Sequence, residues 1–135
     1  MIRILLATTL LGVGTAACAI PSTCDGQLVG MRVSKLKPGG SMAGFADAVR
    51  ANQAWYASHG MKDDRITSAP VFETVDKTMK PSVTSIVSLH VYGAGSTETF
   101  KRDAAWDAFV AKYKANASIQ SETRMCLPKG TLALR

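Results

Sequence analysis

The order of two hydrophobic periodicities constrains the fold of this chain more than any other feature. Alternation of apolar and polar residues is typical of half-buried strands, and apolar residues at every third or fourth position are typical of amphipathic helices. Both patterns occur, separated by turn-forming residues. The predicted strands are 28–36, 65–75, 84–92 and 119–127, and the predicted helices are 41–59 and 97–117. The order is therefore strand, helix, strand, strand, helix, strand.

This order predicts an α+β fold of the ferredoxin-like type, βαββαβ. In that arrangement the four strands form one antiparallel sheet, and both helices cover the same face. The 135 residues suit one domain, and the sequence contains no repeat or linker. We therefore predict a single domain over residues 20–135. Pro70 within the second strand predicts that this strand lies at a sheet edge or contains a bulge.

The first residues are typical of an export signal. Arg3 precedes an apolar run over 4–13, and Ala17-Cys18-Ala19 supplies small residues suited to cleavage. The run is shorter than the about 20 apolar residues that span a bilayer. We predict a bacterial signal peptide over 1–19, cleaved after Ala19, and a periplasmic or secreted protein.

Lipidation of Cys18 is the alternative to simple cleavage. Thr15-Ala16-Ala17-Cys18 resembles a bacterial lipobox, in which the cysteine becomes the acylated first residue of the mature chain. Thr15 stands where such motifs usually carry leucine, which favours simple cleavage. Lipidation would hold the domain at a membrane, whereas we otherwise predict no membrane partner after processing.

The cysteine count supports export. Removal of residues 1–19 leaves Cys24 and Cys126, an even number that suits one disulfide in an oxidising compartment. In the ferredoxin-like topology the first and last strands are antiparallel neighbours, so the start of one lies beside the end of the other. Cys24 precedes the first strand, and Cys126 lies at the end of the last. Spacing and topology therefore both predict a Cys24–Cys126 disulfide.

A family resemblance is carried by the first strand and the helix after it. The strand Met31-Arg32-Val33-Ser34-Lys35-Leu36-Lys37-Pro38-Gly39 is followed by Phe45-Ala46-Asp47-Ala48-Val49-Arg50 and by Trp55-Tyr56. This pattern resembles the first half of dimeric α/β-barrel proteins, which include antibiotic-biosynthesis-monooxygenase-like and NIPSNAP-like domains. The resemblance implies a homodimer that apposes the open faces of two sheets and encloses a ligand cavity between them.

The third strand supplies the candidate ligand-binding residues. Successive side chains of a strand point to opposite faces, and we assign the more apolar set, Val87, Leu89 and Val91, to the helix-covered face. The other set then lines the open face, together with Arg32 of the first strand. We expect Arg32 and His90 to orient an anionic or carbonyl-bearing ligand. The predicted ligand-binding residues are Arg32, Ile86, Ser88, His90 and Tyr92.

Structural roles are the alternatives for several of these side chains. His90 can serve as a hydrogen-bonded strand residue, and His59 suits the negative end of a helix dipole. Trp55 and Tyr56 point about 100° apart on a helix, so we expect one in the core and the other at a rim or interface. Trp106 is expected in the core.

Composition and motifs exclude several chemistries. The sequence contains no zinc or haem-attachment spacing, phosphate loop, dinucleotide fingerprint or serine-nucleophile motif. The net charge of +6 comes from scattered lysines and arginines, which does not suggest a nucleic-acid footprint. We therefore predict no metal, no cofactor and no nucleic-acid partner.

Two functions remain. We favour a small-molecule-binding or scaffold domain that holds a small apolar or aromatic ligand, because a binding cavity needs only a suitable shape. The alternative is a cofactor-independent monooxygenase-like enzyme that acts on a small aromatic substrate. Its candidate catalytic residues are His90 and Tyr92, with Arg32 as a further group that orients the substrate.

Overall fold

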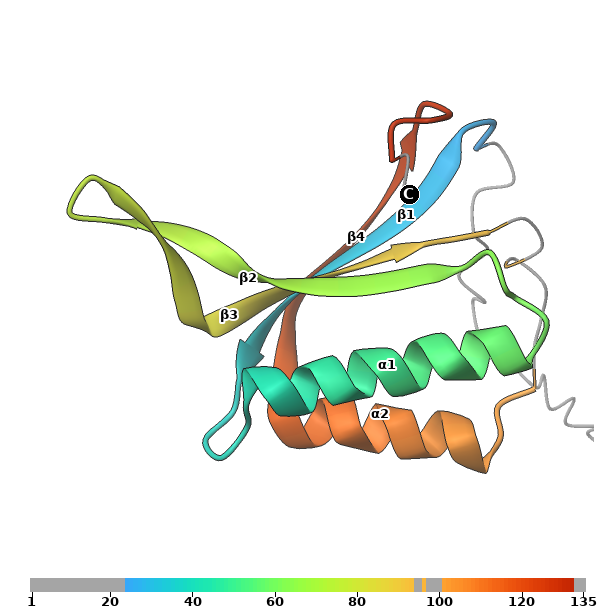
Figure 1. Ribbon diagram of the computed structural model, residues 1–135, viewed down its shortest axis with the longest axis horizontal. Helices are drawn as coiled ribbons and strands as arrows, with labels where there is room; N and C mark the ends of the chain where they lie inside the picture. Colours follow the sequence, from blue (N-terminus) through green and yellow to red (C-terminus); the bar gives the residue numbers. More distant parts are fainter. Residues whose placement is uncertain (1–23, 94–95, 97–100, 133–135) are drawn as a thin grey trace, which may run out of the picture.

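The structure, a computed structural model, describes residues 24–93, 96 and 101–132. Its strands are β1 (Gln27–Leu36), β2 (Arg65–Val75), β3 (Thr78–Val91) and β4 (Ala117–Leu127), and its helices are α1 (Met42–Ser58) and α2 (Ala104–Asn116). The strands form one antiparallel sheet in the order β2-β3-β1-β4, and both helices lie on one side of it (Figure 1). The predicted ferredoxin-like α+β fold is confirmed. The predicted signal peptide and Cys18 lie outside the described residues.

Helix α1 begins and ends where its sequence predicts. The Ser41 side chain caps the first turn by accepting a hydrogen bond from the Gly44 N–H at 2.9 Å. Gly60, with φ +85, follows the last turn in the left-handed conformation that glycine tolerates best. Between these ends, Phe45 and Val49 pack against Ile86 of β3, which fixes α1 over the sheet.

Helix α2 begins later than the helical spacing of its apolar residues predicts. The predicted start at Thr97 lies outside the described residues, but residues 101–103 are described and are not helical. Asp103 is the N-cap, and its Oδ1 accepts hydrogen bonds from the Trp106 N–H and from Trp55 Nε1, both at 2.8 Å. The Asp103 carboxylate thus caps α2 and joins it to α1. The pattern of residues within one helix does not predict such a contact between two helices.

Strands β2 and β3 extend beyond the sheet as a two-stranded arm, residues 71–83. The predicted gap between the strands at 65–75 and 84–92 is too long, because Asp76 and Lys77 alone form the turn, with φ of 52 and 63, and β3 already begins at Thr78. Pro70 lies on an edge strand, next to a shift in register, as predicted. Figure 1 shows the arm bending away from the helices. The arm exposes large apolar side chains, which are Phe72, Val75, Met79 and Val83.

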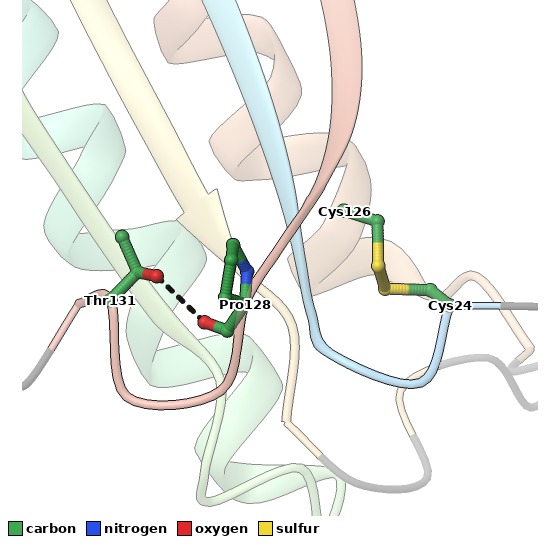
Figure 2. The surroundings of a disulfide bond; sticks show 4 residues. All are labelled: Cys24, Cys126, Pro128 and Thr131. Atoms are coloured by element: carbon green, nitrogen blue, oxygen red, sulfur yellow. Dashed lines mark hydrogen bonds between the residues drawn. A yellow bond between two sulfur atoms is a disulfide. The ribbon is translucent and has the colours of Figure 1, made fainter.

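The predicted disulfide is present. Strands β1 and β4 are neighbours, with Leu28 paired to Cys126, and Cys24 lies just before β1. The Cys24 and Cys126 Cα atoms are 5.6 Å apart and their sulfurs are bonded (Figure 2). Beyond the bond, the Thr131 hydroxyl donates to the Pro128 carbonyl at 2.8 Å and closes a turn after β4. The disulfide therefore links β1, a central strand, to β4, an edge strand, at one end of the sheet.

The assignment of sheet faces from the sequence is wrong. Ile86 packs against Phe45 and Val49 of α1, so the set that contains Ile86, Ser88 and His90 faces the helices. Val87 and Leu89 lie on the open face, where they pair with Val33 and Met31 of β1. The more polar set is thus covered and the more apolar set is open, which reverses the expected arrangement.

Candidate functional site

A cavity of about 580 Å³ lies between the helices and the sheet. It lies within a single chain on the helix-covered face of the sheet, whereas the family resemblance implied a cavity between two sheets. Its lining comes from α1, α2, β1, β3 and β4 and the segments beside them. The aromatic part of this lining consists of Phe45, Tyr56, Tyr92, Trp106, Phe109 and Tyr113. Volume and composition are those of a pocket for a small organic molecule.

Aromatic packing between α1 and α2 and within α2 forms the wall of the cavity. The Tyr113 ring meets the Phe45 ring edge to face at 5.1 Å, and the Trp106 ring meets Phe109 in the same way at 4.8 Å. Burial raises the pKa of Tyr113, and the Asn52 hydrogen bond opposes this only in part. Burial likewise raises the pKa of Tyr56, so both hydroxyls remain protonated at neutral pH.

The charged lining is entirely cationic in the described part of the chain. It consists of Arg32, Lys37, Arg102, Lys114 and Arg124, and no Asp or Glu lines the cavity among the described residues. Glu122 lies nearby and pairs with Arg32, at 3.1 Å between Nε and Oε2. Burial lowers the pKa of Arg32, but Glu122 outweighs burial, and the pKa lies above its ordinary value. The cavity therefore favours an anionic ligand.

A buried carboxyl group holds His90 in place. Asp64 has an exposed fraction of 0% and lies just before β2. Its Oδ2 is 2.6 Å from His90 Nε2, while its Oδ1 accepts from the Gly93 N–H at 2.9 Å and from the Ser96 hydroxyl. Because both oxygens act as acceptors, Nε2 of His90 donates to Asp64. The Nδ1 atom of His90 is then the acceptor nitrogen of a neutral imidazole.

Neighbouring rings and burial define the state of His90. Its ring stacks on Tyr92 at 3.9 Å and meets the Tyr56 ring edge to face at 4.7 Å. Burial lowers the pKa of His90, and the hydrogen bond and charge of Asp64 oppose this shift only in part. A neutral, oriented imidazole in a cavity can accept a hydrogen bond or a proton from a ligand.

Most of the predicted ligand-binding residues come together. Arg32, Ser88, His90 and Tyr92 all line the cavity. Ile86 has an exposed fraction of 3% and packs in the core instead. The arrangement thus joins the two residues expected to orient a ligand, Arg32 and His90, on one surface.

Sequence reasoning missed two residues of this site. Asp64 stands in a polar Lys62-Asp63-Asp64 segment that reads as a solvated loop, and only the tertiary structure places it behind His90. The sequence does mark Asn52 as unusual, because it is a polar residue at a position in the apolar stripe of α1. Its Nδ2 donates to the Tyr113 hydroxyl at 3.3 Å and links the two helices beside the cavity.

Trp55 and His59 have structural roles. The His59 ring stacks on Trp55 at 4.1 Å, and His59 Nε2 lies 3.1 Å from Asp103 Oδ2, which ties the end of α1 to the cap of α2. The expectation that either Trp55 or Tyr56 lies at a rim is wrong, because both are buried. Trp106 is partly buried and lines the cavity.

Among residues 24–93, 96 and 101–132, no three His, Cys, Asp or Glu side chains are grouped so as to hold a metal ion. No helix in this part of the chain has the length and apolar character needed to cross a membrane. The sequence matches no protein-family model and no curated protein.

Proposed function

We propose that this protein is an exported small-molecule-binding domain of the dimeric α/β-barrel type, which holds an aromatic anion between its helices and its sheet. The composition of the cavity carries the proposal. Rings of Phe45, Trp106 and Tyr113 supply apolar area for an aromatic ligand, and five cationic residues without an acidic one among the described lining supply the charge preference.

A pair of fluorescent probes tests this preference. Anilinonaphthalenesulfonate is an aromatic anion, and phenylnaphthylamine has the same rings without the sulfonate. We expect the sulfonate to bind more tightly, and the Arg124→Gln variant to weaken its binding about fivefold, since a half-exposed charge contributes about 1 kcal/mol. Fluorescence titration at fixed ionic strength measures both dissociation constants.

Arg50→Gln is the matched control. Arg50 is an exposed cation on α1 that pairs with Asp47 and does not line the cavity. Arg50→Gln should not change the dissociation constant of either probe. Arg124→Gln should not change the dissociation constant of the uncharged probe. Equal binding of the two probes, or an equal loss in both variants, would contradict the assignment of an anion site.

The open face of the sheet supports the homodimer. Met31, Val33, Val87 and Leu89 are half-buried apolar side chains on adjacent strands of this face. A second copy presents the same rows, so two such faces can meet across a twofold axis. Because the cavity lies on the other side of the sheet, each protomer keeps its own cavity in this dimer.

Leu89→Glu is expected to convert the dimer to a monomer, because it places an unpaired charge in the centre of an apolar contact. Light scattering after size-exclusion chromatography measures the mass. Ala54→Glu adds the same charge to an exposed position of α1 and should leave the dimer intact. A monomeric unmodified protein would overturn the proposed assembly, while the proposed cavity would be unaffected.

The Asp64–His90 pair favours a second candidate function, a cofactor-independent monooxygenase-like enzyme. Asp64 orients a neutral imidazole whose Nδ1 can accept the proton of a phenolic substrate, and Tyr92 stacks on the imidazole. Turnover of a phenol in air, lost in His90→Ala while the dimer persists, would favour the enzyme. Binding of aromatic anions without turnover favours the binding protein.

A further inference from the structure

The wall that α2 contributes to the cavity is apolar in its middle and cationic at both ends. The apolar part follows helical spacing and consists of Trp106, Phe109, Val110 and Tyr113. At one end the Arg102 guanidinium lies over the Trp106 ring, with its Cζ 5.2 Å from the ring centroid. At the other end Lys114 follows Tyr113 and also lines the cavity. An apolar stretch of helix therefore separates two cations.

A second lysine joins Lys114 at its end of the cavity. Helix α2 passes directly into β4 there, with no loop between Asn116 and Ala117 (Figure 1). The Lys37 backbone N–H donates to the Asn116 carbonyl at 3.0 Å, and Lys37 Nζ donates to the Lys114 carbonyl at 2.6 Å. A neutral carbonyl leaves the Lys37 charge uncompensated. Lys37 and Lys114 together form the lysine end of the cavity.

Three arginines form the other end of the cavity, the arginine end, which consists of Arg32, Arg102 and Arg124. Glu122 lies 3.1 Å from Arg32 and 3.7 Å from Arg124, so it neutralises part of their charge. The Asp103 carboxylate, next to Arg102 in the sequence, contacts Trp55 and His59 of α1 and does not line the cavity. The arginine end therefore keeps an excess of positive charge.

The two ends lie far apart on both walls of the cavity. Trp106, which lies under Arg102, and Lys114 are eight positions apart on α2, or about 12 Å at the rise of an α-helix. Glu122, which lies beside the other two arginines, is five positions after the start of β4, or about 16 Å at the rise of a strand. A molecule with one ring is shorter than either distance, so only an elongated ligand reaches both ends.

We infer that the cavity takes an elongated aromatic dianion, with one anionic group at the lysine end, the other at the arginine end and its rings against the apolar part of α2. This inference rests on the proposed function, which assigns an aromatic anion to the cavity, and it adds the number and the separation of the anionic groups. Cations in two separate groups favour two separate anionic groups, because opposite charges attract most strongly at short distance.

Three biphenyl acids test the inference by displacement of anilinonaphthalenesulfonate. The monocarboxylate has one para carboxylate, the two-ended dicarboxylate has a para carboxylate on each ring, and the one-ended dicarboxylate has both carboxylates on the same ring. We expect the two-ended dicarboxylate to bind about fivefold more tightly than its one-ended isomer, since it forms ion pairs at both ends. The two isomers have the same charge, so the comparison isolates the separation of the anionic groups.

Lys114→Gln and Arg102→Gln each remove one cation from one end. Both variants should weaken binding of the two-ended dicarboxylate by about threefold to fivefold, whereas the one-ended isomer should lose affinity in only one of them. Lys112→Gln is the matched control, because Lys112 is an exposed lysine of the same helix that does not line the cavity. It should change none of the dissociation constants.

The outcomes separate the two proposals. If the sulfonate and the biphenyl acids bind but the two dicarboxylates bind equally, the two-ended site is overturned and the proposed function stands. A loss of affinity for the two-ended dicarboxylate in only one of the two variants, or an equal loss in Lys112→Gln, also overturns the two-ended site. If neither the sulfonate nor any biphenyl acid binds, the proposed function fails and the two-ended site fails with it. Thermal unfolding of each variant verifies that it is folded during the titration.

Discussion

Loss of the Cys24–Cys126 disulfide is expected to lower the free energy of unfolding by about 4 to 5 kcal/mol. The bond joins residues 102 positions apart, and the chain-entropy model gives about this stabilisation for a loop of that length. The loss is a large share of the about 5–15 kcal/mol that stabilises a typical domain. Urea unfolding of the Cys24→Ser/Cys126→Ser variant measures it.

Reduction provides the control for that experiment. Dithiothreitol should lower the stability of the unmodified protein to that of the double variant, and it should leave the double variant unchanged. An unmodified protein whose unfolding midpoint is insensitive to reductant would contradict a stabilising role for the bond. A double variant that also loses stability in reductant would show that the reductant acts elsewhere.

Asp64→Ala is expected to cost about 3 to 5 kcal/mol, because it removes one partner from a buried network. The carboxyl group of Asp64 is fully buried and accepts hydrogen bonds from His90, Gly93 and Ser96. Its removal leaves the Gly93 N–H without its acceptor and releases the His90 ring, while the Ser96 hydroxyl keeps only the Gly93 carbonyl as an acceptor. Chemical denaturation monitored by circular dichroism measures the change.

The neighbouring Asp63 is a matched control. It has the same side chain one position earlier and is exposed. Asp63→Ala should change the stability by less than about 0.5 kcal/mol, as surface substitutions usually do. Similar losses in the two variants would mean that the negative charge of this segment, rather than the buried network, stabilises the fold.

Local periodicity was sufficient to predict the order of the elements and the disulfide. Alternation in 28–36 and in 84–92 reflects the pleat of β1 and β3, and the β1–β4 pairing followed from the order alone. The start of β3 at Thr78 was not predictable from turn-forming residues. Two consecutive positive φ angles at Asp76 and Lys77 close the turn in two residues, and strand pairing continues through Lys80 and Pro81.

The site was only partly predictable because its orientation depends on how the helices sit on the sheet. Alternation separates Ser88 and His90 from Val87 and Leu89, but it does not say which set the helices cover. The general tendency to cover the more apolar set fails here, because a cavity, and not a continuous core, separates α2 from the strands. The role of Asp64 depends on contacts with residues 26 to 32 positions away.

The arm, residues 71–83, and the rest of the domain are expected to differ in how readily they unfold locally. The arm bends away from the helices (Figure 1), and its apolar side chains Phe72, Met79 and Val83 are largely exposed. Few tertiary contacts oppose its separation from the rest, so we expect it to fray as a local unit. His90 and Arg32 lie on strand segments held between neighbours on both sides. The cavity can therefore stay formed while the arm opens and closes.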